Sequence, residues 1–101
     1  MIKVKVKREN NNITYINVTG HAKFADYGSD IVCSAVSCLC FTIANQLLSI
    51  DDSLNITAEN NDFSFTNLSD THDVQLLLNT LVNGLVQVEN EYSKNIKVME
   101  V

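Results

Sequence analysis

Residues 31–50 read IVCSAVSCLCFTIANQLLSI, and this apolar run decides the fold. Apolar side chains would occur nearly all round a helix over residues 30–50, which predicts a central, buried helix. Ser29 and Asp30 stand just before the run, where a side-chain oxygen accepts a hydrogen bond from the free N–H groups of a first helical turn. The run approaches the length of a membrane span, but polar residues interrupt it and no basic cluster flanks it. We therefore expect a core helix and no membrane partner.

Alternating segments on both sides of this run indicate strands. Residues 2–7 alternate apolar residues with lysines, and residues 13–19 alternate again after a polar turn, so the two segments predict a hairpin. Residues 54–58 and 63–65 predict a second hairpin around a turn rich in Asn and Asp.

The end of the chain supplies one more helix and one more strand. Apolar residues recur at helical spacing over about 71–92, with Ser69 and Asp70 as the expected caps, and residues 96–101 form a short strand. The order β-β-α-β-β-α-β predicts an α+β fold. Residues 1–101 would form a single small domain whose largely antiparallel sheet packs on two helices. The apolar surface of both helices also suggests a dimer interface.

Composition and charge set limits on function. The 101 residues include 46% hydrophobic and 19% charged residues, as expected of one globular domain. Twelve acidic side chains outweigh 7 basic ones, for a net charge of −5. This balance argues against direct nucleic-acid binding. The alternation that follows Met1 is unlike a signal peptide, so we expect a cytoplasmic protein with reduced thiols.

The three cysteines lie close together in the sequence but do not form a metal site. Cys33 and Cys40 would stand about 10 Å apart along one helix, and Cys38 and Cys40 would point about 200° apart around it. The same geometry forbids a disulfide within the helix. We expect no metal and no cofactor, and we interpret Cys38 and Cys40 as small buried hydrophobic residues.

Cys33 has a different expected environment. With Asp30 as the N-cap, Cys33 would fall in the first helical turn, where free N–H groups and the helix dipole stabilise a thiolate. His21, twelve residues upstream in an irregular stretch over residues 20–29, is a candidate general base. Spacing alone favours a loop histidine and a core cysteine over a catalytic pair.

The whole segment from Gly20 to Ser37, GHAKFADYGSDIVCSAVS, carries more information than the spacing. It closely resembles the signature of the ribosomal-processing cysteine protease (Prp) family, in which G-H, a short loop and G-x-D-I-V-C-A-A-V-S carry the active site. A weaker resemblance continues through residues 81–92. The resemblance implies a cytoplasmic, homodimeric endopeptidase that trims the N-terminal extension of large-subunit ribosomal protein number twenty-seven.

The resemblance also assigns roles to individual residues. Cys33 would be the nucleophile and His21 the general base. Asp30 matches an acidic position of the family, although a helix cap already explains an Asp there. Ser37, one turn beyond Cys33, would line the site, and Gly20 would permit the loop conformation.

The remaining matches concern the loop and the departures from the family pattern. Phe24, Tyr27 and Gly28 would belong to a loop that folds over the bound peptide. Ser34 and Ser93 stand where the family usually has Ala and Pro, and neither touches the expected chemistry. The alternative function is a non-catalytic dimeric module that binds a ribosomal or ribosome-assembly protein.

Overall fold

The computed structural model describes residues 1–20, 27–60 and 62–101, and of residues 27–30 it describes the backbone alone. The elements follow the predicted order. They are β1 (Ile2–Glu9), β2 (Asn12–Thr19), α1 (Tyr27–Ile50), β3 (Asn55–Glu59), β4 (Asp62–Thr66), α2 (His72–Glu91) and β5 (Ile96–Glu100). The predicted α+β class and the single small domain are confirmed.

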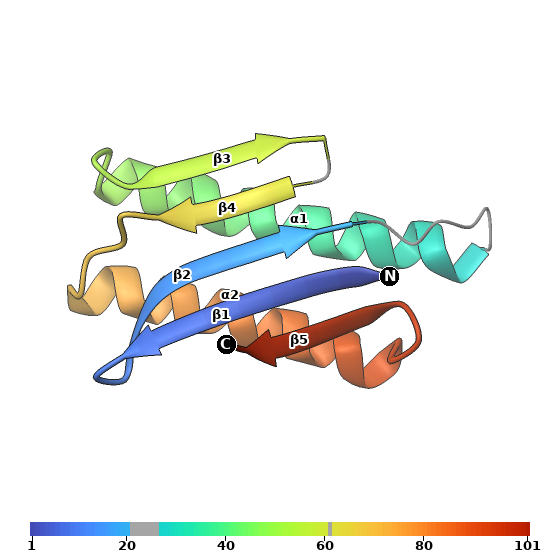
Figure 1. Cartoon of the computed structure of the whole chain (residues 1–101). Coiled ribbons are helices and arrows are strands. Elements are labelled where there is room, and N and C mark those ends of the chain that lie inside the picture. The colour runs from blue at the N-terminus through green and yellow to red at the C-terminus, as the bar shows by residue number, and fades with distance from the viewer. Residues whose placement is uncertain (21–26, 61) are drawn as a thin grey trace.

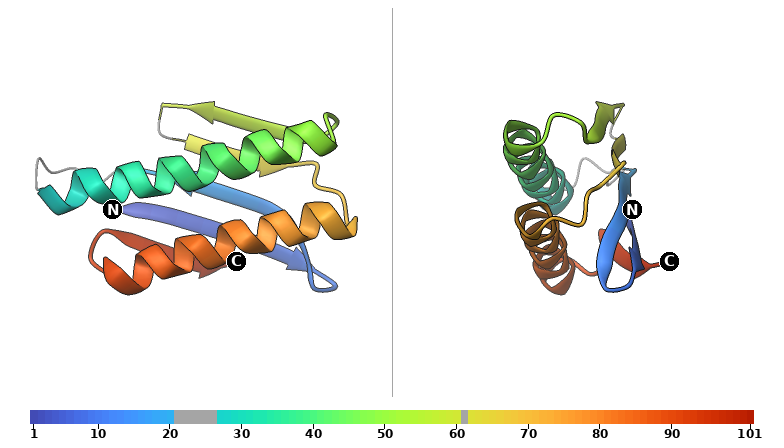
Figure 2. Two further views of the ribbon diagram at one scale, coloured as in Figure 1. Left: turned by 180° about the vertical axis from the view of Figure 1, so that it is seen from behind. Right: turned by 90° about the vertical axis from the view of Figure 1, so that its left-hand side faces the viewer.

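The five strands form one sheet in the order β3-β4-β2-β1-β5 (Figure 1). β1 pairs antiparallel with β2, β2 with β4 and β4 with β3, whereas β1 and β5 are parallel. The largely antiparallel sheet is therefore confirmed. Both helices pack on the same side of the sheet, so the molecule has two layers and the opposite face of the sheet is left uncovered (Figure 2).

Alternation along β1 places one set of side chains in the core. Ile2, Val4 and Val6 are 2%, 0% and 0% exposed, while the lysines between them are exposed. β1 ends later and β2 begins earlier than predicted, so the turn between them is short. Asn10 and Asn11 both adopt a positive φ and close the hairpin in two residues. Asn tolerates this left-handed conformation better than most residues do.

Helix α1 begins at Tyr27, which corrects the predicted start at residue 30. Tyr27 and Gly28, expected in a substrate loop, belong to its first turn, and the expected irregular stretch is correspondingly shorter. The loop was predicted because the apolar periodicity stops at residue 30. A helix that is already nucleated nevertheless gains one hydrogen bond for each residue added, and no proline prevents that extension.

Only one face of α1 is buried, which corrects the expectation of a helix buried all round. This face packs into the core through Val32, Val36, Cys40, Ile43, Ala44 and Leu47. Ile31, Phe41, Leu48 and Ile50 are between 38% and 51% exposed. Residues 31–50 are long and apolar enough to cross a membrane, a test that the core helix of a globular domain also passes. The absence of a membrane partner stays a prediction.

The start of α2 also differs from the prediction. Thr71 occupies the N-cap, and no side chain caps the helix, so Ser69 and Asp70 are not its caps. Ser69 instead offers its backbone carbonyl to Gln75 Nε2 at 2.9 Å. The buried Gln75 side chain also exchanges hydrogen bonds with the backbone of Ile13. This side chain therefore ties α2 to β2, and tertiary contacts take the place of the predicted cap.

Candidate active site

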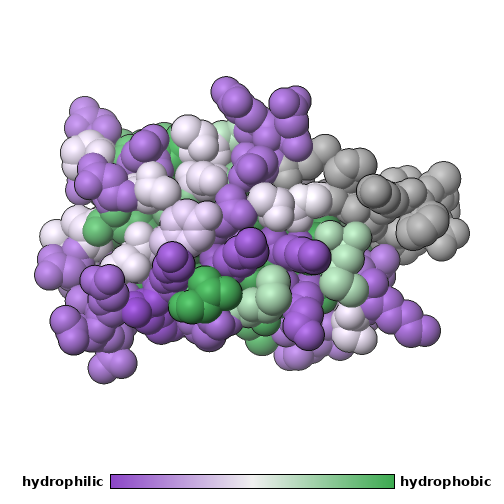
Figure 3. All heavy atoms as spheres, viewed as in Figure 1, coloured by the Kyte–Doolittle hydropathy of each residue, from purple (hydrophilic) through white to green (hydrophobic). Residues whose placement is uncertain are grey.

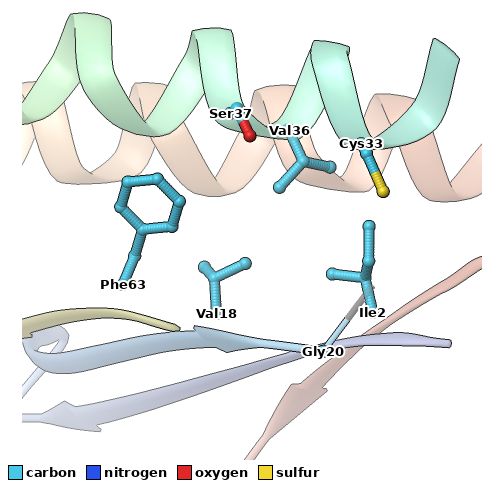
Figure 4. Close-up of a pocket in the computed structure, with 7 residues that line it drawn as sticks. All are labelled: Ile2, Val18, Gly20, Cys33, Val36, Ser37 and Phe63. Carbon is cyan, nitrogen blue, oxygen red and sulfur yellow. The ribbon is translucent and has the colours of Figure 1, made fainter. Parts of the chain in front are cut away.

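A shallow pocket lies between the first half of α1 and the sheet (Figure 4). It is lined by Ile2, Val18, Gly20, Cys33, Val36, Ser37 and Phe63. These residues come from β1, the end of β2, α1 and β4. The pocket thus brings together three residues of the predicted site, Gly20, Cys33 and Ser37.

The Cys33 thiol is free and partly buried. It points from α1 toward the sheet, above Ile2 (Figure 4). Ser37 follows four residues later, so its side chain stands one helical turn further along the same face. The two side chains offer a sulfur and a hydroxyl to whatever enters the pocket.

Cys33 does not lie in the first turn of its helix, which corrects its predicted environment. Because α1 begins at Tyr27, Asp30 is already inside the helix and is not the N-cap. Cys33 lies six residues after Tyr27, where its backbone N–H belongs to the intrahelical ladder. The effect of the helix dipole falls off within the first turn, so it does not explain a reactive thiol at Cys33.

Gly20, directly after β2, adopts a backbone conformation and a close contact that only glycine allows. Its φ is +86°, and a β-carbon added to it would lie 2.6 Å from the Met1 carbonyl oxygen. The chain therefore leaves β2 in a left-handed conformation, pressed against the first residue of the sequence. The predicted base His21 and the loop residue Phe24 lie outside the described residues.

The other two cysteines have opposite environments. Cys40 is 0% exposed, and burial raises the pKa of its thiol from 9.0 to about 12. Cys40 is thus the buried hydrophobic residue that the sequence predicted. Cys38 is exposed, so the same prediction was wrong for that residue. It lies on the face of α1 that the sheet and α2 do not cover.

Four residues that line the pocket were missed by the sequence reasoning: Ile2, Val18, Val36 and Phe63. Their alternation marked the strand residues as core, but nothing in it showed that the core opens at this end of the sheet. Phe63 also meets the exposed Phe41 edge-to-face, with ring centroids 4.9 Å apart. Among residues 1–20, 27–60 and 62–101, no group of three His, Cys, Asp or Glu side chains is placed to hold a metal ion.

Comparison with known proteins identifies the family. The sequence model of the family described as cysteine protease Prp matches residues 1–97. The chain belongs to the Prp family of cysteine proteases. It is similar to the ribosomal processing cysteine protease Prp of Staphylococcus aureus (strain Mu50), with 29% identity over 90 residues that cover 85% of each protein. The Prp of Bacillus subtilis (strain 168) is 26% identical over 107 residues, covering 97% of this chain and 96% of the relative.

Solved structures of Prp agree with this assignment. The S. aureus protease in complex with a substrate peptide matches the chain with a TM-score of 0.89 at 25% identity, each chain being covered in full. The same protease with a covalently linked product peptide matches equally well at 26% identity. The protein is a cysteine-type peptidase of the ribosomal processing family. The alternative of a non-catalytic binding module therefore has no support from the relatives.

Proposed function

We propose that this Prp protein is a cytoplasmic endopeptidase that removes the N-terminal extension of large-subunit ribosomal protein number twenty-seven. Cys33 is the nucleophile and His21 the general base. The observation that carries the proposal is the partly buried Cys33 thiol in a pocket that Gly20 also lines. Gly20 directly precedes His21 in the sequence, which supports the choice of His21 as the base.

The chemistry needs only these two side chains, the peptide and water. His21 takes the proton of the Cys33 thiol as the sulfur attacks the scissile carbonyl carbon and forms a C–S bond. The C–N bond then breaks, and His21 returns the proton to the leaving amine. Water hydrolyses the resulting thioester, which restores the thiol and releases the new carboxylate. The covalently linked product peptide on the S. aureus relative supports this course.

A homodimer is the second part of the proposal, and exposed residues of α1 support it. Positions 31, 34, 38, 41, 45 and 48 follow one another at steps of three and four residues, and all six side chains are exposed. Ile31, Phe41 and Leu48 are the large apolar members of this stripe, at 46%, 51% and 38% exposed. This spacing is that of a helix seam packed against another helix. We call these six positions the α1 stripe and assign it to the contact between two copies.

Incubation with the extended ribosomal protein tests the function. Intact-mass analysis should show a single cut that releases the N-terminal extension, while the ribosomal protein lacking the extension stays whole. Cys33→Ala should abolish the cut, and Cys38→Ala, which removes an exposed thiol of the same helix, should retain it. Cleavage by purified Cys33→Ala would overturn the assignment of the nucleophile, and cleavage at several unrelated bonds would overturn the proposed substrate.

The general base is tested separately. His21→Ala should lower the cleavage rate by a factor of about 100 or more while the protein stays folded. Imidazole added to the assay should restore part of that rate, because it replaces the missing proton acceptor. Turnover by His21→Ala at the wild-type rate would exclude His21 from the mechanism but leave Cys33 as the nucleophile.

A further inference from the structure

The uncovered face of the sheet carries a row of lysines. The residues of β1 that point away from the helices include Lys3, Lys5 and Lys7, and Lys97 on β5 stands beside them on the same face. All four side chains are exposed. Figure 3 views the molecule from this side, where the surface over the strands is mostly hydrophilic. We call these four residues the basic face.

No acidic side chain stands next to these lysines across the strands. On β2, the partners of Lys3, Lys5 and Lys7 are Thr19, Asn17 and Tyr15. On β5, Lys3 is beside Lys97 and Lys5 is beside Met99. Neither of the two ion pairs formed within residues 1–20, 27–60 and 62–101 includes a member of the basic face. Within the part of the chain that the structure describes, no ion pair therefore neutralises these four charges.

The needs of the sheet do not explain this arrangement. Lysines often protect edge strands from pairing with other chains, which accounts for Lys97 on the edge strand β5, but β1 lies between β2 and β5 and has no free edge. Lysine is depleted in strands, and like charges on directly neighbouring strand positions, as at Lys3 and Lys97, are destabilising. The pairing of Lys3 with Lys97 thus places two like charges side by side on the exposed face of the sheet.

The ten acidic residues whose side chains the structure describes lie elsewhere. They cluster in the loop after α1, in the β3–β4 hairpin and at both ends of α2, with Glu9 and Glu100 at the far ends of β1 and β5. Glu100 pairs with Arg8 at 3.1 Å. The net charge of −5 is an average that hides this separation, so it does not by itself exclude an anionic partner at the basic face.

We propose that the basic face binds the phosphate backbone of RNA. Alternate residues of a strand are about 6.8 Å apart and neighbouring strands about 4.8 Å, so the four lysines form a row of positive charge that an extended polynucleotide can follow. Tyr15 lies on the same face, with Lys7 Nζ 5.7 Å from its ring centroid, and adds an aromatic surface for a base. The relatives are named ribosomal processing cysteine proteases, which is consistent with work close to RNA.

An anionic membrane would also attract lysines, but the apolar residues are in the wrong place for it. Binding at a membrane surface needs apolar side chains beside the basic ones. Five of the seven large exposed apolar residues, Ile31, Phe41, Leu48, Ile50 and Leu76, lie on α1 and α2, in the opposite layer from the basic face; Met1 and Val101 stand singly at the ends of the sheet. RNA binding fits this separation, and it stands independently of the proposed peptidase activity.

Fluorescence anisotropy with a labelled, unstructured single-stranded RNA tests the proposal on the full chain. The affinity should fall with salt, with a slope of log K against log salt of about −3 if all four lysines meet phosphates. Lys3→Thr/Lys5→Thr/Lys7→Thr should lower the affinity about tenfold or more, because three of the charges are lost while threonine suits a strand. Lys5→Thr alone should weaken binding, whereas Lys94→Thr, the same change on a lysine in the turn after α2, should not.

Two further measurements make each outcome decisive. The triple variant should cut a free peptide at the wild-type rate, which shows that it folds and separates RNA binding from the peptidase proposal. Vesicles containing phosphatidylserine should not bind more tightly than neutral vesicles. Absence of RNA binding at low salt, equal losses in Lys5→Thr and Lys94→Thr, or binding to the anionic vesicles without binding to RNA would each overturn the proposal.

Discussion

Gly20 approaches Met1 so closely that any side chain at position 20 would meet the Met1 carbonyl oxygen, at 2.6 Å from a β-carbon. This contact joins the end of β2 to the beginning of the chain. It lies at the mouth of the pocket, where Gly20 and Ile2 face Cys33. The shape of the candidate site thus depends on a backbone contact that involves none of the proposed catalytic side chains.

Gly20→Ala should therefore damage both stability and activity. The positive φ and the clash together should lower the free energy of unfolding by about 2 kcal/mol or more. Because Gly20 joins β2 to His21, the cleavage rate of the protein that remains folded should fall as well. Urea unfolding and cleavage assays measure the two effects. A variant with wild-type stability would show that the backbone relaxes without cost.

Gly84→Ala provides the matched control. A β-carbon at Gly84 would lie 3.1 Å from Leu39 Cδ2, a flexible side-chain atom that moves more easily than a backbone carbonyl. Alanine is also better than glycine inside a helix by about 1 kcal/mol. The free energy of unfolding should change by less than about 1 kcal/mol, and cleavage should persist. An equal loss of stability in both variants would show that the contact between Gly20 and Met1 does not set position 20 apart from other glycine positions.

Asn17 shows where reasoning from the sequence was incomplete. Alternation placed it on the outer face of the sheet, where a polar residue is normally solvated, yet it is only 8% exposed. Its Nδ2 donates to Asp62 Oδ1 at 2.9 Å, to Ser64 Oγ at 2.9 Å and to the Phe63 carbonyl at 3.2 Å. These partners lie more than 40 residues away, and local periodicity carries no information about them.

Asn17→Ala should lower the free energy of unfolding by about 1 to 2 kcal/mol, because it removes the amide that donates to a buried carbonyl and to two side chains. The loss should be larger than that caused by Thr57→Ala, an exposed position on β3. Asn17 holds the carbonyl of Phe63, which lines the pocket, so the substitution should also disturb the site. The cleavage rate should therefore fall even at a temperature where the variant is fully folded. Denaturant unfolding and cleavage rates at a temperature where both variants are folded provide the measurements.

The parts of the fold that the sequence predicted are those set by local chemistry. The alternation in β1, the Asn-rich turns and the periodicity of α2 each require only neighbours along the chain. The predicted start of α1 and the predicted caps of α2 were wrong, because a helix end depends on tertiary contacts. At the start of α2, for example, the Gln75 side chain bonds to the backbone of Ile13 and Ser69. The burial of Cys40 and the exposure of Cys38 depend on which face of α1 meets the sheet, and an apolar run does not reveal that face.

The α1 stripe leads to a prediction about assembly. Leu48→Glu should shift a dimer toward monomer, because it places a charge in an apolar helix seam. Leu76→Glu is the matched control, since Leu76 is also exposed, at 56%, but lies on α2. Light scattering coupled to size-exclusion chromatography gives the molecular mass of each variant. A dimer that survives Leu48→Glu but not Leu76→Glu would move the interface to α2.

The Cys40 thiol should make stability depend on pH in the alkaline range. Burial raises its pKa from 9.0 to about 12, so the folded protein keeps a proton that the unfolded chain releases above about pH 9. The folded state therefore binds more protons, and stability is full below pH 9 and falls as the pH rises toward 12. The slope contributed by this one group approaches about 1.4 kcal/mol per pH unit.

Other groups also titrate in this range, so the difference between variants is the informative quantity. Cys40→Ala should be less stable than the wild type near neutral pH by about 1 kcal/mol, because it truncates a buried side chain. Its deficit should shrink as the pH rises above about 9, since the variant has no thiol to ionise. A constant difference between wild type and Cys40→Ala up to about pH 11 would show that the folded protein releases the Cys40 proton as easily as the unfolded chain does.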